Sequence, residues 1–395
     1  MGTVFNIAKE YVTTGTTTDT YLYTFPNNIM LTAIYIIIFK VFNIIKINDF
    51  ITIATVFNSL LVAGTGILLY YNTKKIFNNS KALMILIITV LTTPLYLYCA
   101  CYYSDTFSMF LTMLIIYIYL KNKENDDLII SAIWQILFAI TVVVGIKMKI
   151  TCIFILIAII VYKILNNKIN IKEFLKKFGI ATILGVILYI SFDGIIVPKF
   201  IPDKQMLDAN KIPIEHWIMM GLYGRGNFEY GEYHYTQSFP TLEEKRQETR
   251  KVIKERLILK WQENTLFKHI KGKLGFAWYD GSYYIPDLLR REPVKKGILH
   301  EIVLEEGNNT SIYKYWPQIM HFSMLIFLCI NIYRIIINKD YLAKDNILFI
   351  AIYGILVFLL IWENRSRYLL TMLPIIIMSQ LGGIEYLAKR KEENK

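Results

Sequence analysis

Ten apolar blocks, each close to the roughly 20 residues that a helix needs to cross about 30 Å of hydrocarbon, follow one another along this chain of 395 residues. The blocks are 29–45, 50–71, 82–100, 102–120, 128–146, 150–166, 179–198, 315–337, 345–362 and 368–386. Hydrophobic residues make up 55% of the sequence and charged residues 19%, which is too apolar for a water-soluble domain of this size. The sequence therefore predicts an all-α polytopic membrane protein with about 9–10 hydrophobic helices.

The segment 199–314 is polar instead and holds four of the five histidines, so we expect it to fold outside the membrane. The predicted organisation has five parts: a partial first extracytoplasmic loop (1–49) with a re-entrant or interfacial apolar segment, transmembrane helices (50–198), a large extracytoplasmic loop (199–314), further transmembrane helices (315–388) and a cytoplasmic tail (389–395).

The formal net charge of +12 would indicate a nucleic-acid partner in a soluble protein, but here the lysines and arginines gather in short loops between apolar blocks. Basic loops at 74–81, 121–123, 163–177 and 339–344, together with the tail, are expected on the cytoplasmic side. The turns at 102–105, 147–149 and 363–367 then face the outside. We expect the lipid bilayer and no nucleic acid as a partner.

The turn Tyr102-Tyr103-Ser104-Asp105 joins two apolar blocks and places a carboxylate just inside the outer membrane face. An acidic side chain is costly at that depth unless it has a use. One interpretation is a helix N-cap formed by Ser104 or Asp105. The other is a carboxylate directed into an outward-facing cavity, with Tyr102 and Tyr103 beside the substrate.

The turn Glu363-Asn364-Arg365-Ser366-Arg367-Tyr368 places two arginines at the outer interface, where the positive-inside rule disfavours them. Guanidinium groups bind phosphate through paired hydrogen bonds, so Arg365 and Arg367 are candidates to hold the phosphate of a lipid carrier, with Glu363 and Tyr368 contacting substrate. Alternatively, Glu363 pairs with one arginine and both arginines reach lipid head groups.

Three further features have both functional and structural interpretations. Lys147 and Lys149 either add positive charge beside the same phosphate or extend toward head groups. Trp278 and Asp280 combine an aromatic ring with a carboxylate, a composition that suits a sugar ring, although plain loop packing is the alternative. Residues 241–273 have the pattern of one amphipathic helix that lies on the membrane or packs against the bundle.

With these turns in place, the chain resembles the GT-C class of membrane glycosyltransferases, in particular bacterial proteins similar to protein O-mannosyltransferases and aminoarabinose transferases. Three short motifs carry this resemblance: Tyr23-Thr24-Phe25-Pro26-Asn27-Asn28 before an apolar block, Tyr103-Ser104-Asp105, and Glu363-Asn364-Arg365-Ser366-Arg367-Tyr368-Leu369-Leu370 followed by Pro374. They extend over most of the chain but are only moderately specific, so they indicate a class of enzyme and no particular substrate.

The resemblance implies transfer of a sugar from a polyprenyl-phosphate donor to a hydroxyl of a glycan, lipid or protein acceptor, outside a bacterial cytoplasmic membrane and usually with inversion. An aspartate of the first loop would act as general base, and basic residues or a divalent metal such as Mg²⁺ or Mn²⁺ would stabilise the departing phosphate. By position, Asp105 matches the second acidic site of the class, and Arg365 and Arg367 match residues that hold the donor.

The start of the chain departs from the class. In similar proteins a first transmembrane helix and an aspartate precede a stretch like Gly2-Thr3-Val4-Phe5, so the resemblance implies a truncated N-terminus and leaves Asp19 as a fallback base. Periodicity leaves open whether block 29–45 crosses the membrane. If it crosses, residues 1–28 are cytoplasmic; if it is re-entrant, they lie outside.

Three alternatives remain at this point. A lipid-linked saccharide polymerase or ligase would depend on His216, His234, Arg225 or Arg290 rather than on Asp105. A transporter or flippase would have internal repeats and broken helices with polar residues at the bilayer midplane. A scaffold would retain the fold without catalysis.

Overall fold

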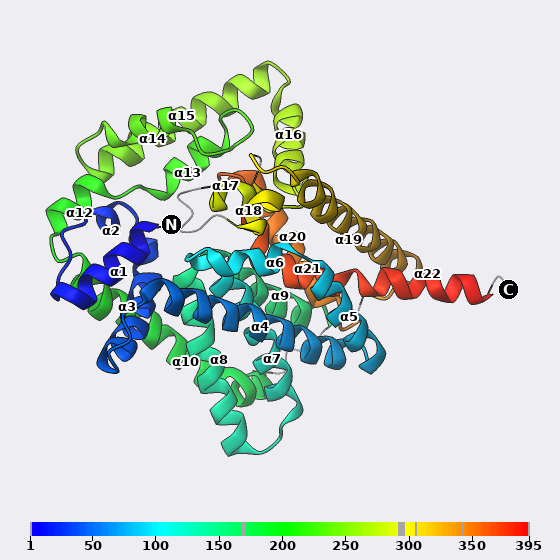
Figure 1. Cartoon of the computed structure of the whole chain (residues 1–395). Helices are drawn as coiled ribbons and strands as arrows, with labels where there is room; N and C mark the ends of the chain where they lie inside the picture. The colour runs from blue at the N-terminus through cyan, green and yellow to red at the C-terminus, as the bar shows by residue number, and fades with distance from the viewer. Residues whose placement is uncertain (1, 167–170, 291–296, 305, 342, 394–395) are drawn as a thin grey trace. The chain divides into compact units, whose positions relative to one another are not determined.

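A computed structural model describes the chain except residues 1, 167–170, 291–296, 305, 342 and 394–395. The described residues form helices joined by short turns, with no strand among them, which confirms the prediction of an all-α protein (Figure 1). They divide into two compact units, each assembled from separate stretches of chain. Unit 1 contains Met1–Phe50, Ile190–Tyr279 and Ile355–Leu369, and unit 2 contains Ile51–Tyr189, Asp280–Gly354 and Leu370–Lys395.

Unit 1 is built from short helices and from the helices of the polar loop. Its elements are α1 (Gly2–Thr14), α2 (Tyr21–Thr24), η1 (Pro26–Asn28), α3 (Ile29–Ile44), the π-helical turn η4 (Phe192–Ile196), α11 (Val197–Phe200), α12 (Lys204–Asn210), α13 (Ile214–Gly221), α14 (Tyr230–Gln237), α15 (Leu242–Gln262) and α16 (Leu266–Trp278).

Unit 2 contains most of the long apolar helices. Its elements are α4 (Phe50–Ile76), α5 (Asn79–Leu91), α6 (Pro94–Leu97), η2 (Tyr98–Ala100), α7 (Ser104–Glu124), α8 (Leu128–Met148), η3 (Ile150–Cys152), α9 (Ile153–Leu165), α10 (Ile171–Ser191), α17 (Ile285–Leu289), α18 (Ile298–Val303), α19 (Thr310–Asn338), α21 (Leu373–Ser379) and α22 (Leu381–Glu393). Two further elements, α20 (Asn346–Ile361) and the 3₁₀ helix η5 (Ser366–Met372), are divided between the units, and α4 and α10 each extend into unit 1 by one or two residues.

Six helices in the described part of the chain are long and apolar enough to cross a membrane. They are Pro26–Ile44, Phe50–Ile76, Leu128–Met148, Leu175–Phe200, Thr310–Asn338 and Ser366–Glu393. Asn79–Leu91 and Pro94–Ala100 form a seventh candidate as a bent pair, and Ile150–Leu165 and Asn346–Ile361 are shorter apolar helices. The chain is therefore a multi-pass protein.

Two expected helices are broken. Block 82–100 bends by 62° between α5 and α6, because Pro94 has no N–H for the preceding turn and starts a new helix at its first position. The amphipathic segment 241–273 is two helices instead of one: α15 ends at Gln262 and α16 begins at Leu266. Between them Asn264 has a left-handed φ of 54°, which turns the chain at a corner visible in Figure 1.

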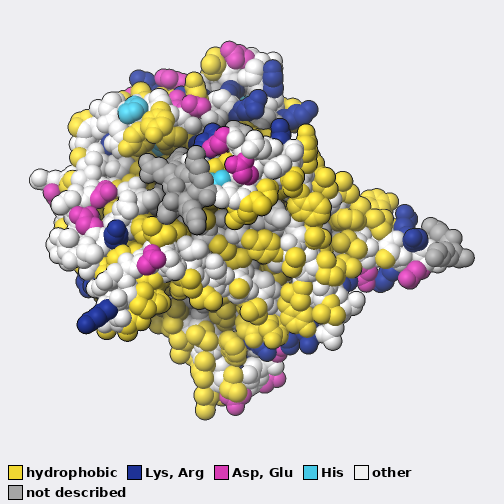
Figure 2. Space-filling view, viewed as in Figure 1, with side chains coloured by type: hydrophobic (Ala, Val, Ile, Leu, Met, Phe, Trp, Pro, Cys, Tyr) yellow, Lys and Arg dark blue, Asp and Glu magenta, His cyan; other side chains and the backbone are white. Residues whose placement is uncertain are grey.

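Exposed apolar side chains cover the long helices of unit 2. In Figure 2, hydrophobic atoms extend over α4, α5 and α19, where Leu60, Ile87 and Ile326 are each more than half exposed. A surface of this kind is unfavourable in water and suits contact with lipid. In unit 1, by contrast, Lys and Arg atoms gather over the corner between α15 and α16 (Figure 2).

Helices α19 and α22 of unit 2 approach closely at a pair of glycines. A Cβ atom at Gly383 would meet the Phe327 carbonyl, and one at Gly382 would meet the Asn331 side chain. Asn331 in turn donates from Nδ2 to the Ser379 carbonyl at 2.7 Å, which satisfies a polar group between the helices. Small residues that allow such backbone contact are the usual basis of helix association in membranes.

We predict that Gly383→Ala lowers stability by about 1–3 kcal/mol, because the added methyl group has no space beside the Phe327 carbonyl. Thermal unfolding in detergent measures the change. Gly185→Ala in α10 is the matched control, since a Cβ there meets nothing within 4 Å and alanine favours a helix. Equal melting temperatures for the two variants would contradict the close contact.

Candidate functional site

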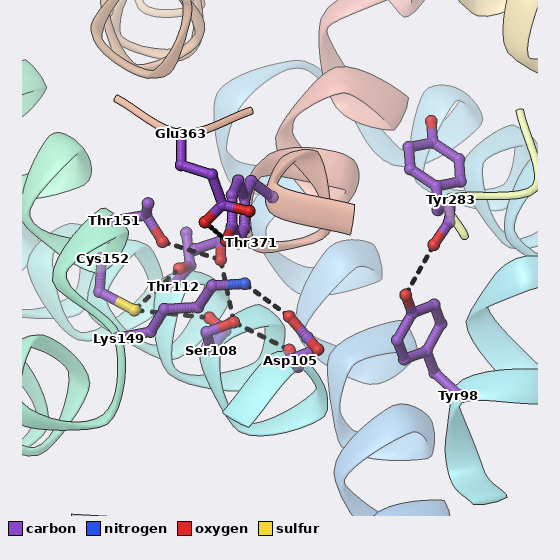
Figure 3. A network of polar contacts seen from close by, with 11 residues as sticks. Tyr98, Asp105, Ser108, Thr112, Lys149, Thr151, Cys152, Tyr283, Glu363 and Thr371 are labelled. Carbon is purple, nitrogen blue, oxygen red and sulfur yellow. Dashed lines mark hydrogen bonds and ion pairs between the residues drawn. The ribbon is translucent and has the colours of Figure 1, made fainter. Parts of the chain in front are cut away.

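The carboxylate of Asp105 lies in the first turn of α7 and forms an ion pair with Lys149 (Figure 3). Lys149 Nζ is 2.5 Å from Asp105 Oδ1, and the two side chains are only 12% and 1% exposed. The helix N-terminus adds a favourable partial positive charge to the carboxylate. Tyr103 occupies the N-cap position, so the expected N-cap at Ser104 or Asp105 is wrong.

A network of buried hydroxyl groups lies next to this pair in unit 2 (Figure 3). Ser108 Oγ donates to the Asp105 carbonyl at 2.8 Å and contacts Thr371 Oγ1 at 3.0 Å. Thr151 Oγ1 donates to the same Thr371 oxygen at 3.0 Å. These contacts connect α7, η3 and η5, so the backbone that carries Asp105 and Lys149 is held from three elements. Sequence reasoning missed them because isolated Ser and Thr residues carry no motif.

Two further residues of the predicted site have structural contacts. Tyr102 shares a hydrogen bond of 2.8 Å with Thr55 Oγ1. Lys147 lies 3.4 Å from the centroid of the Tyr189 ring, a cation–π arrangement on α10. Their proposed contacts with substrate remain predictions, and so does a direct role for Lys149 at a donor phosphate.

We predict that Lys149→Met destabilises the protein by about 3–5 kcal/mol, because it leaves the buried Asp105 carboxylate without its countercharge. Thermal unfolding in detergent, read as a double-mutant cycle, tests this. Adding Asp105→Asn to Lys149→Met should restore much of the loss. Additive effects of the two substitutions would contradict a coupled pair, and Lys147→Met serves as the control from the same turn.

The turn between α20 and η5, in unit 1, buries a second carboxylate. Glu363 is 2% exposed, and its Oε2 accepts a hydrogen bond from Tyr368 Oη at 2.5 Å. Arg365 Nε is 3.6 Å from Oε1, so the expected pairing of Glu363 with one arginine is confirmed. Burial raises the pKa of Glu363, although Tyr368, Arg365, Arg367 and Lys273 act against that shift.

The two arginines of this turn lie over aromatic rings. The Arg365 guanidinium carbon is 5.9 Å from the Phe228 ring centroid, and that of Arg367 is 5.7 Å from the Tyr368 ring centroid. The Arg365 side chain remains 21% exposed. Contact with a ring face helps to orient each guanidinium group.

Residues from the polar loop fix the backbone of the turn, and sequence reasoning missed them. Lys273 Nζ on α16 donates to the Trp362 carbonyl at 2.8 Å. The Asn364 N–H donates to the Gly226 carbonyl at 2.7 Å, and its Nδ2 donates to the Lys273 carbonyl at 2.5 Å. A Cβ at Gly221 would lie 2.6 Å from the Ile361 carbonyl, so only glycine permits this approach.

The position of Lys273 in the sequence could have indicated its burial. It follows Leu266 and Ile270 at helical spacing, so it occupies the apolar face of its helix, where a lysine is unusual. The side chain is fully buried in the structure. Burial lowers the pKa of Lys273 to about 8, while the nearby Glu363 carboxylate acts in the opposite direction.

We predict that stability rises with pH from about 8 to about 10.5, the usual range of lysine in an unfolded chain, because there the unfolded Lys273 binds a proton that the native one has lost. The rise should be smaller in Lys273→Met, where the buried Lys245 still contributes, and unchanged in Lys271→Met, whose exposed lysine lies two residues away on the same helix. Melting temperatures across this pH range measure it. A rise of equal size in Lys273→Met and the unaltered protein would refute the assignment.

The remaining predicted acids lie in local turns. Asp19 is exposed, and its Oδ1 accepts from the Tyr21 N–H at 2.7 Å. Asp280 accepts at Oδ1 from the Ser282 N–H and hydroxyl and at Oδ2 from the Tyr284 N–H, at 2.6–2.9 Å. Asp280 thereby orders a turn whose next residues include two tyrosines with left-handed φ angles of 52° and 69°. A sugar contact by Asp280 or Trp278 stays a prediction.

The residues on which a polymerase or ligase would depend differ in burial and in their contacts. His216 is fully buried, with Nδ1 2.7 Å from Thr236 Oγ1, and burial lowers its pKa to about 4. His234 is exposed and stacks on Tyr230. In unit 2, Arg290 Nε lies 3.9 Å from Glu306 Oε2.

Within the described part of the chain, no three His, Cys, Asp or Glu side chains are grouped so that they could hold a metal ion. The carboxylate at the centre of the candidate site, Asp105, instead has an ammonium group at 2.5 Å. The residues in place therefore do not fit the divalent metal considered from the sequence, and no step below depends on one.

Searches of curated proteins and of solved structures found no significant match to this chain. Residues 6–385 match a family described as "Conserved hypothetical integral membrane protein". That match extends over nearly the whole sequence, including the apolar blocks up to residue 385, Asp105, Glu363 and the polar loop. The chain is therefore a member of this family of integral membrane proteins.

Proposed function

We propose that this protein is a GT-C type glycosyltransferase of a bacterial cytoplasmic membrane. It moves a sugar from a polyprenyl-phosphate donor to an acceptor hydroxyl on the outer face. The observation that carries the proposal is the buried Asp105–Lys149 pair at the N-terminus of α7. A carboxylate at that turn is the acidic position that the sequence resemblance assigns to the class.

Asp105 acts as the general base in this proposal. It accepts the proton of the acceptor hydroxyl while the hydroxyl oxygen forms a bond to the anomeric carbon of the sugar. The bond between that carbon and the phosphate oxygen breaks, and its electron pair leaves with the polyprenyl phosphate. Lys149 holds the carboxylate in place and supplies positive charge beside the reacting groups.

Arg365 and Arg367 bind the leaving phosphate. Each guanidinium group lies over an aromatic ring, which orients it, and guanidinium groups bind phosphate through paired hydrogen bonds. Inversion at the anomeric carbon follows from the single displacement.

A transporter or flippase is the second candidate, and the 62° bend between α5 and α6 favours it, because transporters place their binding sites at broken helices. A flippase and a transferase differ in what they release. A flippase moves the lipid-linked sugar intact, whereas a transferase releases polyprenyl phosphate.

We predict that the protein in nanodiscs releases undecaprenyl phosphate from at least one member of a panel of undecaprenyl-phosphate sugars when a cell-envelope fraction is supplied as acceptor. Asp105→Asn should slow release by about 10²–10⁴-fold, and Arg365→Ala by about 10²–10³-fold. Mass spectrometry of the lipid product measures both.

Matched controls for this assay are Asp340→Asn, at an exposed residue, and Arg246→Ala, whose side chain is 41% exposed. Both controls should keep the rate of the unaltered protein. Unchanged release in Asp105→Asn and Arg365→Ala would eliminate the proposed roles of these residues. Movement of intact donor across the bilayer without release would favour the flippase.

A further inference from the structure

A continuous row of aromatic rings crosses unit 1. The row, called here the aromatic strip, consists of Phe358, Trp362, Trp217, Phe25, Tyr233 and Phe228. Neighbouring ring centroids are 5.2 Å apart for the first pair and 6.4 Å apart for each of the others. Residues from three distant stretches of sequence contribute, so the strip exists only in the folded unit.

The strip is partly open to its surroundings. Every one of its six rings is half-buried and none is fully buried, unlike the large aromatic residues of the protein's core. At the Phe228 end, Tyr230 packs edge-on at 5.5 Å and is 71% exposed, and the exposed His234 stacks on Tyr230. A row that served only as core would be expected to bury such rings.

Polar groups border the strip at the same end. Arg365 lies over Phe228, and Asn227 donates from Nδ2 to Glu229 Oε1 at 2.8 Å, with both of these side chains partly buried. Together with the Tyr233 and Tyr230 hydroxyls and the His234 ring, they supply donors and acceptors of every common type. The rim therefore combines hydrogen-bonding groups with partly exposed aromatic side chains.

We infer that the aromatic strip binds the saccharide chain of the acceptor. One face of a pyranose ring presents C–H groups that pack on the negative face of an aromatic ring, and its hydroxyls need the polar neighbours found here. An isoprenoid chain would pack on the rings but would leave the amide, carboxylate and imidazole without use. That the saccharide is the acceptor rests on the proposed function; that it binds here does not.

The strip also reaches the turn that carries the phosphate-binding arginines. Trp362 precedes Glu363 directly, and Arg365 contacts Phe228 at the other side of the row. A chain of sugars along the rings would thus approach Arg365 with one end. The inference names a glycan, in preference to a lipid or a protein, as the acceptor class.

Binding to an array of immobilised oligosaccharides tests the inference, with the full-length protein in nanodiscs as the probe. The best-bound oligosaccharide is then titrated in solution, with tryptophan fluorescence as the readout. We predict binding by the unaltered protein and a loss of about tenfold or more in affinity for Trp217→Ala and for Phe228→Ala. Trp261→Ala is the matched control, because Trp261 is 74% exposed in the same unit but lies off the strip.

Trp217→Phe guards against misfolding, since it keeps an aromatic ring and should bind within about threefold of the unaltered protein. Three results would overturn the inference: no oligosaccharide bound on the array, equal binding by the alanine variants and the control, or fluorescence changes caused by undecaprenol in the nanodisc instead of by saccharide. The array contains no donor lipid, so failure of the proposed transfer reaction would not remove saccharide binding.

Discussion

The ion pair between Asp105 and Lys149 sets the conditions that the surrounding helices of unit 2 must meet. A carboxylate that is 1% exposed cannot remain charged in an apolar bundle unless a countercharge and hydrogen-bond donors compensate for lost water. Lys149 supplies the countercharge, and the N-terminus of α7 adds a partial positive charge. The hydroxyls of Ser108, Thr151 and Thr371 hold the backbone around the pair. Such an arrangement is costly to build, and a costly buried charge is a reason to look for chemistry.

Unit 1 solves a similar problem with different groups. Glu363 is buried beside Tyr368 and Arg365, and the turn that carries it is fixed through its backbone by Lys273 and Asn364. The part of the polar loop in unit 1 therefore supports this turn. It forms helices whose buried lysine and closely approaching glycines hold the turn in one conformation.

The sequence was sufficient for the class of fold, because apolar blocks of membrane-spanning length determine helices almost without regard to context. It was sufficient for Asp105 and for the Glu363 turn, because charges at the ends of apolar blocks are conspicuous. It did not predict the partners. These partners lie far apart in the chain. They include Lys149 with Asp105, Lys273 with the Trp362 carbonyl, and the residues of the aromatic strip. The apolar pattern of 241–273 continues through Asn264, although the helix ends there. Periodicity could not predict the break because it carries no information on a left-handed φ angle.

The proposed function requires that a polyprenyl phosphate bind at the arginines of the Glu363 turn. A cryo-EM structure in nanodiscs that contain undecaprenyl phosphate tests it most directly. The account predicts phosphate density within hydrogen-bond distance of the Arg365 or Arg367 guanidinium group. Phosphate density bound elsewhere on the protein, or none when the lipid is present at saturating concentration, would contradict the account.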